Sequence, residues 1–392
     1  EWQRLSPEDD VEGPEGLSMV VEQLDGFEAA AAAWESEILP ARVADYDPSW
    51  LDSLCLSGRC TWARLSPART GGRDTEAEAP VVRGRGGPVR TTPIALLQRS
   101  NLRAWPQLET WPEDLHLSPE AQGVYSYLQR RGASFFAEIA SGTRLLRTQV
   151  EAALGELVSQ GLVSADSFMG LRALLVPSER RKPLHDGGRR RRAVAHYGVE
   201  DAGRWGILRT PQHAEAVAGD GSALPLAVDT STAEAVAPVL LRRWGIVFRK
   251  LVEREPAAPP WRELLAVLRR LEARGEIRGG RFVDGFSGEQ FALPEAVGTL
   301  RQVRKSPRTG AFVAVSGADP LNLVGVLTPG ARVPVHTDNR VLYRDGVPLA
   351  VRVAGEIRLL EATEDGTTTW EIRQALVRRR VPPQLRRVLR FA

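Results

Sequence analysis

The sequence predicts an α+β fold in which similar units recur along the chain and a β-rich segment follows them. Between residues 17 and 300, helical segments repeatedly lead into a strand, a turn and a second strand. From Thr309 onward, short alternating strands separated by turns replace that pattern. Helices followed by a β-hairpin form the outline of a winged helix. We therefore predict tandem winged-helix domains followed by a small β-barrel or sandwich.

Shifts in composition and periodicity give the boundaries of these domains. We predict a linker at 1–16 and an N-terminal α/β unit at 17–110, for which a winged-helix-like fold is one interpretation. A winged helix at 111–178, a basic loop and linker at 179–230 and a second winged helix at 231–300 follow, and a β-barrel with a basic C-terminal helix occupies 301–392.

The N-terminal unit contains each part of the pattern. Gly16–Val43 is expected to be helical, because its apolar face continues through the run Ala29–Ala33, which has high helix propensity. Asp47-Pro48 predicts a capped second helix. Strands are expected at Arg59–Leu65 and Val89–Gln98, joined by a polar, glycine-rich loop that would be an enlarged wing.

The second unit starts at Ser118-Pro119-Glu120, a strong signal for a helix N-terminus. Further helices are expected at Phe135–Ser141 and Leu146–Gln160, followed by a hairpin that pairs Leu162–Ser164 with Leu171–Val176. The basic loop Arg180–Arg192 comes next, and it is either a solvated linker or an arm that binds the DNA backbone.

The third unit, Trp244–Val297, is the clearest. Prolines 259 and 260 suit the start of a long helix, and Gly275 suits its left-handed C-terminal cap. We expect Gly279-Gly280 at the tip of the hairpin that follows. The apolar stripe of the helix consists of Trp261, Leu264, Leu265, Leu268 and Leu271.

Beyond this unit, Asp345-Gly346 predicts a two-residue hairpin turn between alternating strands. Trp370–Arg390 is expected to be a basic helix, interrupted by Pro382-Pro383.

The charge of the chain is modest, at +3, but 49 of its 52 basic residues are Arg. Arg-rich coding bias and selection for phosphate contacts are two explanations of this excess. Cys55 and Cys60 are too few for a structural zinc site, and we expect both to be reduced and buried, with a disulfide as the alternative. No apolar run approaches the roughly 20 residues that span a bilayer. We therefore expect a cytoplasmic protein without a membrane partner.

Sequence motifs exclude several kinds of chemistry. The chain has no G-x-x-x-x-G-K-[ST] loop, no H-E-x-x-H and no G-x-S-x-G. It therefore lacks a Walker-type ATP site, and we expect no metal or cofactor in this chain.

Exposed basic residues on the predicted helices and wings are the candidates for DNA contact. A recognition helix enters the major groove with its outward side chains, and the wing reaches the backbone. Each candidate could instead be a solvated or paired surface Arg, and winged helices also bind proteins. The candidates are Arg144, Arg147, Thr148, Arg172, Arg262, Arg269, Arg270, Arg278 and Arg281.

Several stretches resemble the C-terminal region of the bacterial large helicase-related (Lhr) family. They are LSPEAQ…GASFFAEI, LLRRWGIVFRKLV, PPWRELLAVLRRLEARGEIRGGRFVDGFSGEQFALP and DPLNLVGVLTPG, and the resemblance runs through essentially the whole chain. It implies a superfamily 2 DNA helicase core, N-terminal to this region, that binds ATP and Mg. It also implies a role in DNA repair, single-stranded or branched DNA as a partner, and a homo-oligomer such as a tetramer. The chain starts without Met or a signal peptide, and we expect it to be a piece of a longer protein.

Residues 24–43 are similar to the N-terminal segment of winged-helix DNA glycosylases, whose active-site motif is Gln-x-Gln or a close variant. The corresponding positions here are Glu28-Ala29-Ala30. Glu28 keeps a polar acceptor that could orient a water, whereas Ala30 cannot. Glu28 is therefore the candidate catalytic residue, and a surface helix carboxylate is its simpler interpretation.

Three functions follow from these observations. The first is a DNA-binding region of an Lhr-type helicase, without an ATPase core of its own. The second is a glycosylase that excises uracil or damaged bases, and the third is a module that oligomerises the helicase.

Overall fold

The computed structural model describes residues 1–6, 9–66, 88–105, 115–175, 198–209, 230–360, 369–378, 380–382 and 385. The predicted basic loop at 180–192 lies outside these residues. So does most of the part of the predicted helix Trp370–Arg390 that follows residue 378. Among the helices that are described, none is long and apolar enough to cross a membrane.

The described elements of the first unit have the order helix, strand, helix, helix, strand, strand. Its elements are α1 (Gly13–Gln23), β2 (Glu28–Ala30), α2 (Ala31–Ala33), the π-helix η1 (Trp34–Ile38), α3 (Pro48–Leu56), β4 (Cys60–Ala63), the 3₁₀ helix η2 (Pro88–Thr91), β5 (Pro93–Gln98) and the 3₁₀ helix η3 (Arg99–Ala104). The predicted start of α3 is confirmed, since Asp47 accepts a hydrogen bond from Ser49 N and Pro48 follows it.

The single helix predicted over Gly16–Val43 is wrong. Helix α1 ends at Gln23, and Gly26 then turns the chain with φ of +73°. Ala29 and Ala30 join strand β2 because their backbone pairs with β5, and this tertiary pairing overrides the helix propensity of alanine.

Residues 1–16 are packed, in contrast to the linker predicted there. Gln3 and Leu5 are buried, and β1 (Val11–Glu12) pairs in parallel with β3 (Val43–Ala44).

The second unit repeats the order of the first. Its elements are α4 (Pro119–Arg131), β6 (Ser134–Phe135), α5 (Phe136–Thr143), α6 (Arg147–Ser159), β7 (Val163–Ala165), α7 (Phe168–Leu174), the 3₁₀ helix η6 (Val199–Ala202) and β8 (Arg204–Ile207). Ser118 caps α4 as predicted, because its Oγ accepts from Ala121 N at 3.2 Å. The predicted hairpin partner at 171–176 is wrong, since its described residues form helix α7 and the C-terminal end of that helix. The strand that pairs with β7 is β8, inside the segment predicted as a linker.

The third unit consists of α9 (Thr230–Trp244), β9 (Ile246–Phe248), α10 (Arg249–Val252), α11 (Trp261–Ala273), β10 (Arg278–Gly280) and β11 (Gln290–Ala292). Pro260 precedes α11, and Gly275 follows it with φ of +77°, as predicted. The expected hairpin tip is wrong, because Gly279 and Gly280 lie within β10, opposite β11. The wing is therefore the longer segment 281–289.

All three units share one sheet topology, in which the last strand lies between the other two. The strand orders are β2-β5-β4, β6-β8-β7 and β9-β11-β10. This common topology agrees with the winged helices that the recurring sequence pattern predicts.

After the third unit, α12 (Pro294–Lys305) leads into an antiparallel sheet of β12 (Phe312–Ser316), β13 (Arg340–Arg344), β14 (Val347–Val353) and β15 (Glu356–Leu359). Asp345 and Gly346 both have positive φ, so the predicted two-residue turn is confirmed. Helix α13 (Thr369–Val377) covers one face of the sheet, and a coil within 317–339 packs on the other. The described residues form an open sheet in order β12-β13-β14-β15, so they do not close the predicted barrel.

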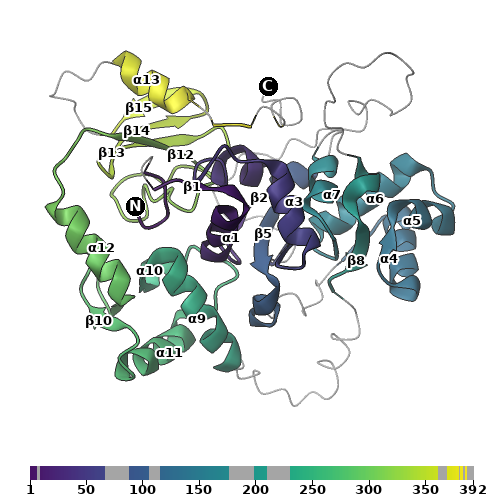
Figure 1. Cartoon of the computed structure of the whole chain (residues 1–392), viewed down its shortest axis with the longest axis horizontal. Coiled ribbons are helices and arrows are strands. Elements are labelled where there is room, and N and C mark those ends of the chain that lie inside the picture. The colour runs from purple at the N-terminus through teal and green to yellow at the C-terminus, as the bar shows by residue number, and fades with distance from the viewer. Residues whose placement is uncertain are drawn as a thin grey trace.

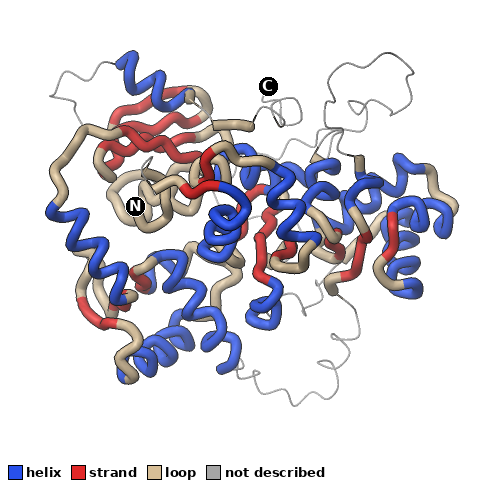
Figure 2. The backbone as a smooth tube through the Cα atoms, in the orientation of Figure 1, coloured by secondary structure: helices blue, strands red, loops and turns tan. Residues whose placement is uncertain are grey.

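The first unit lies at the centre of the molecule (Figure 1). The second unit, with α4 to α7, flanks it on one side, and the third unit and the C-terminal sheet lie on the other. Figure 2 shows the strands of the C-terminal sheet stacked beneath α13 and away from the helices of the second unit. Apolar cores cross these boundaries: one joins the first and second units, and another joins strands β4 and β5 to the third unit.

Candidate nucleic-acid interface

Helix α11 of the third unit presents a buried face and an opposite basic face. Its stripe of Leu264, Val267, Leu268 and Leu271 is buried in the unit. Arg262, Arg269 and Arg270 are exposed, as the helical spacing predicts.

A groove of about 730 Å³ runs between α11 and the wing. Trp261 and Leu265 line it from the helix, and Arg281 lines it from the wing. Gly279 allows strand β10 to lie close to helix α11, because a Cβ at Gly279 would lie 2.0 Å from the Glu272 carboxylate. Buried Gln290 fixes the wing by accepting from Phe282 N and Val283 N, each at 2.8 Å.

Two of the predicted arginines on α11 form ion pairs at the surface. Arg269 binds Glu289 of the wing, and Arg270 binds Glu234 of α9 at 2.7 Å. The hydrogen bond and charge of Glu289 raise the pKa of Arg269. These pairs link α11 to its neighbours and occupy part of its basic face.

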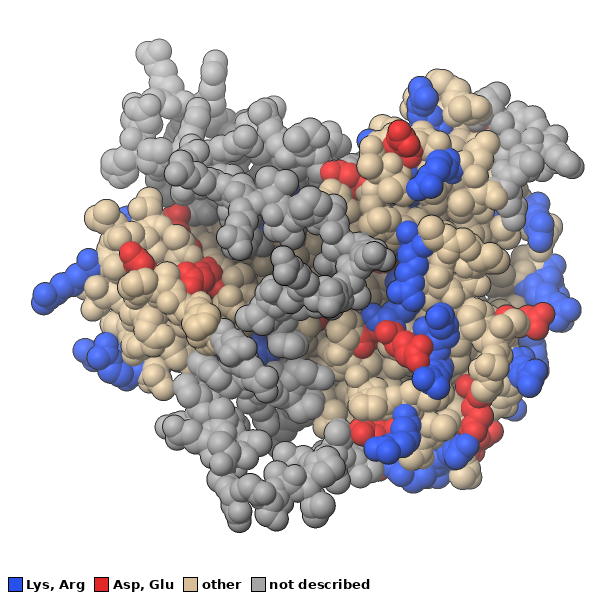
Figure 3. Space-filling view, turned by 180° about the vertical axis from the view of Figure 1, so that it is seen from behind, with Lys and Arg blue, Asp and Glu red and all other residues tan. Residues whose placement is uncertain are grey.

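Three other predicted arginines of this unit are exposed and unpaired. Within the part of the chain that the structure describes, no carboxylate lies within ion-pair distance of Arg262, Arg278 or Arg281. Residues 230–292, which form this unit, contain 11 Lys and Arg against 8 Asp and Glu, which leaves a net charge of +3. Figure 3 shows more Lys and Arg side chains on the half of the molecule with the third unit and the sheet than on the half with the second unit.

The predicted residues of the second unit lie at its surface, Arg144 in the turn between α5 and α6 and Arg147 and Thr148 in the first turn of α6. Arg144, Arg147 and Thr148 are exposed, and Arg147 is paired with Glu200. The described residues of this unit, 115–175 and 198–209, contain seven Lys and Arg and seven Asp and Glu, so they carry no net charge. The structure does not bring these residues near α11, since α5 and α6 lie at the opposite end of the molecule (Figure 1).

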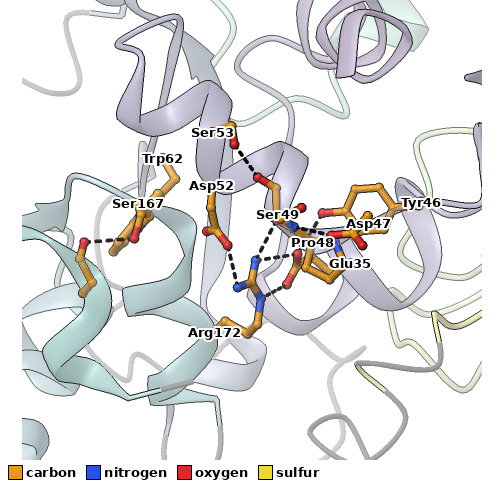
Figure 4. Close-up of polar contacts among 11 residues, drawn as sticks. Glu35, Tyr46, Asp47, Pro48, Ser49, Asp52, Ser53, Trp62, Ser167 and Arg172 are labelled. Atoms are coloured by element: carbon orange, nitrogen blue, oxygen red, sulfur yellow. Dashed lines mark hydrogen bonds and ion pairs between the residues drawn. The ribbon is translucent and has the colours of Figure 1, made fainter. Parts of the chain in front are cut away.

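Arg172 does not lie on a wing, so the prediction that it contacts DNA is wrong. It belongs to α7, is fully buried, and points into the boundary between the first and second units (Figure 4). Its guanidinium donates to both carboxylate oxygens of Glu35, at 2.6 and 2.8 Å, and to Asp52 at 2.9 Å. Burial opposes the charge of Arg172, but these carboxylates outweigh it and raise the pKa of the guanidinium well above its usual value.

Tyr46 completes the cluster by donating its hydroxyl to Glu35 at 2.8 Å. Burial, together with the charge of Glu35, raises the pKa of this hydroxyl well above its usual value. Asp52 lies on α3, the helix that corresponds to α11 in the first unit. Because α3 packs on α7, the helix that reads DNA in a typical winged helix is here covered by the second unit.

Further buried ion pairs hold the C-terminal sheet against the first unit. Arg42 forms a bidentate pair with Asp319, at 2.7 and 2.9 Å, and Arg340 binds Glu37. Sequence reasoning missed these residues, although a lone charge within an apolar stretch, such as Arg42 in ILPARVADY, is a usable signal. The second unit and the C-terminal sheet thus both pack against the first unit.

The candidate catalytic residue Glu28 lies on strand β2 and not on a helix. Its Oε1 accepts from Leu65 N at 2.7 Å and from Ser66 N at 3.0 Å, where β4 leads into the wing. Arg209 lies nearby, and burial lowers its pKa to about 10 against the opposing effect of the Glu28 charge. Within the described residues, no cluster of His, Cys, Asp and Glu could hold a metal ion.

Two family profiles match the chain, and both describe a winged-helix domain of the large helicase-related protein. One matches residues 1–79 and the other residues 227–312, which correspond to the first and third units. The first match is to a winged-helix domain and covers most of the N-terminal unit, up to residue 79.

Two curated relatives are similar over most of the chain. The Lhr helicase/uracil glycosylase of Escherichia coli is 29% identical over 390 residues, which cover 93% of this chain and 23% of that protein. The Lhr helicase/probable uracil glycosylase of Mycolicibacterium smegmatis is 29% identical over 378 residues, which cover 94% of this chain and 22% of that protein. The chain thus spans about a quarter of the length of these relatives. The chain is thus similar to these large helicase-related proteins over most of its own length, and two of its segments match winged-helix domains of that family.

Proposed function

We propose that this chain is the DNA-binding C-terminal region of an Lhr-type helicase, and that its third unit holds the DNA. The observation that supports this is the groove beside α11, which Arg281 lines. Arg262 and Arg278 are exposed on the same unit, and none of the three arginines has an ion-pair partner among the described residues. The second unit is less suited to binding DNA because its described residues carry no net charge. Helix α3 is less suited because the second unit covers it. The helicase core, with its ATP and Mg, would belong to another part of the polypeptide, and the complete protein would act in DNA repair.

The salt dependence of binding tests this proposal. Fluorescence anisotropy with labelled single-stranded and forked DNA gives the affinity at a series of salt concentrations. Neutralising Z phosphates gives a slope of about −0.7Z to −0.9Z in a plot of log affinity against log salt. Arg262→Gln, Arg278→Gln and Arg281→Gln together should reduce that slope by about two to three and weaken binding at every DNA sequence tested.

A matched control removes three exposed charges elsewhere, by Arg130→Gln, Arg131→Gln and Arg373→Gln. It should leave both affinity and slope within about two-fold of the parent chain. An affinity that does not change between low and physiological salt would contradict the proposal.

A second candidate function is base excision, for which we infer a site in the first unit. Both curated relatives carry uracil glycosylase in their names. A hollow of about 310 Å³, which Glu22, Arg59, Gln98 and Ser100 line, could receive a flipped base. A carboxylate there would orient a water that attacks the sugar as the N-glycosidic bond breaks, leaving an abasic site.

Incubation with uracil-containing single-stranded and duplex oligonucleotides, followed by alkali, tests this function. No strand cleavage at enzyme excess would exclude it. Loss of cleavage in Glu28→Gln would assign the reaction to Glu28, whereas loss in Glu22→Gln alone would assign it to the hollow.

A third candidate is a module through which the helicase self-associates, for example as a tetramer. Light scattering at micromolar concentration measures the mass of the particle in solution. A monomeric mass would contradict a function in self-association.

A further inference from the structure

Helix α12 leaves the third unit directly after the wing. It begins at Pro294, two residues beyond the end of β11, and its first turn packs against the unit through buried Ala296 and Val297. From Leu300 onward every helical side chain is exposed. Figures 1 and 2 show the helix along the outer edge of the molecule, between the third unit and the sheet.

The exposed half of α12 carries only positive charge. Arg301, Arg304 and Lys305 have i, i+3 and i+4 spacing, which places them on one face. No acidic residue occurs from Ala296 to Ala318. Arg301 and Lys305 also line a shallow hollow of about 430 Å³.

These cations differ from most others in the third unit. Arg249, Arg269, Arg270 and Arg274 each pair with a glutamate. No such pair forms between the described carboxylates and the three basic residues of α12. The helix dipole favours cations in the last turn, which accounts for Arg304 and Lys305. It does not account for Arg301, which precedes that turn, or for Arg308, which follows the helix.

We propose that α12 binds the phosphodiester backbone of the DNA strand that leaves the groove beside α11. This inference rests on the proposed DNA-binding function and adds a second contact surface to it. The six exposed helical residues from Leu300 to Lys305 extend about 9 Å, a length that matches roughly three stacked nucleotides at about 3.4 Å each. The half-exposed Leu300 and Val303 lie among the cations and can contact sugars and bases.

The test substitutes Arg301→Gln, Arg304→Gln and Lys305→Gln together in the full chain. Glutamine has nearly the same helix propensity as Arg and Lys, so the fold is retained, as circular dichroism and the thermal midpoint will verify. The matched control is again the triple substitution at Arg130, Arg131 and Arg373. Anisotropy is measured with oligonucleotides of increasing length, single-stranded and duplex, over a series of salt concentrations.

We expect the parent chain to gain affinity as the oligonucleotide lengthens by about three nucleotides beyond the minimal site. The α12 variant should lose that gain, and its salt slope should fall by about two, while binding of the shortest oligonucleotide changes less than about two-fold. The control should behave as the parent chain does.

The two proposals can fail separately. If the substitutions at Arg262, Arg278 and Arg281 weaken binding but the α12 variant matches the parent chain, the role of α12 is refuted and the DNA-binding function stands. If the α12 variant instead changes only self-association, the surface belongs to a contact between copies of the chain, which also refutes the inference. If the parent chain binds DNA independently of salt, the proposed function itself fails.

Discussion

Replacing Arg172 should destabilise the chain more than replacing any exposed arginine. Its side chain is fully buried and binds two buried carboxylates, from η1 and α3, across the boundary between the first and second units. Arg172→Met would leave Glu35 and Asp52 in the interior without a cation. Removing one partner of a buried ion pair typically costs about 3–5 kcal/mol, because the remaining charge is not compensated.

Chemical and thermal denaturation measure this loss. A loss of that size should lower the midpoint by about 6–20 °C, at roughly 2–4 °C per kcal/mol for a cooperative unit of this size. Adding Glu35→Gln and Asp52→Asn to Arg172→Met should recover part of the loss, since the amides carry no charge. The control is Arg204→Met, which removes a surface pair with Asp166 and should destabilise the chain far less, because water screens exposed ion pairs.

The outcome that refutes the reasoning is a free energy of unfolding for Arg172→Met within about 1 kcal/mol of the parent chain. The cluster would then not stabilise the boundary between the units.

Three further predictions follow from single sites in the first unit. Burial raises the folded-state pKa of Asp25, so the folded chain takes up a proton at a higher pH than the unfolded chain does. Lowering the pH from 7 should therefore stabilise the parent chain relative to Asp25→Asn. Denaturation curves at several pH values measure the difference in stability between the two chains, and a difference that does not change with pH would contradict the prediction. Cys55 and Cys60 are buried, with their sulfur atoms 3.4 Å apart, and both the hydrogen bond to Cys60 and burial raise the pKa of Cys55 well above its usual value. A thiol reagent should therefore react with neither residue until the chain unfolds, and rapid reaction of the native chain would show the prediction wrong. Gly26→Ala should destabilise by about 2 kcal/mol or more, because Gly26 has φ of +73° and a Cβ would lie 1.9 Å from the Trp105 ring; an unchanged thermal midpoint would refute this.

Local signals in the sequence were sufficient to locate many helices and turns. Ser118-Pro119 and Asp47-Pro48 start helices where expected, because a capping side chain and a fixed proline φ act within a few residues. The Asp345-Gly346 turn and the face of α11 follow from equally local rules.

These local rules did not predict which strands pair when the partners lie far apart in the sequence. The partner of β7 is β8, about 40 residues further along the chain, while the nearer segment around Leu171 folds as α7. Both segments are apolar, and periodicity over so few residues does not separate a short helix from a strand. Ala29 and Ala30 likewise change from the predicted helix to a strand, through their pairing with the last strand of their own unit.

The sequence by itself determined the repeated winged-helix pattern and which arginines its helices carry. Only the tertiary structure decided which of those arginines reach solvent. Arg172 and Arg281 are both predicted to lie on wings, yet one is buried between two carboxylates and the other borders an open groove. The physical reason is that burial and ion pairing depend on side chains from distant segments, here Glu35 and Asp52, which share no local pattern with Arg172.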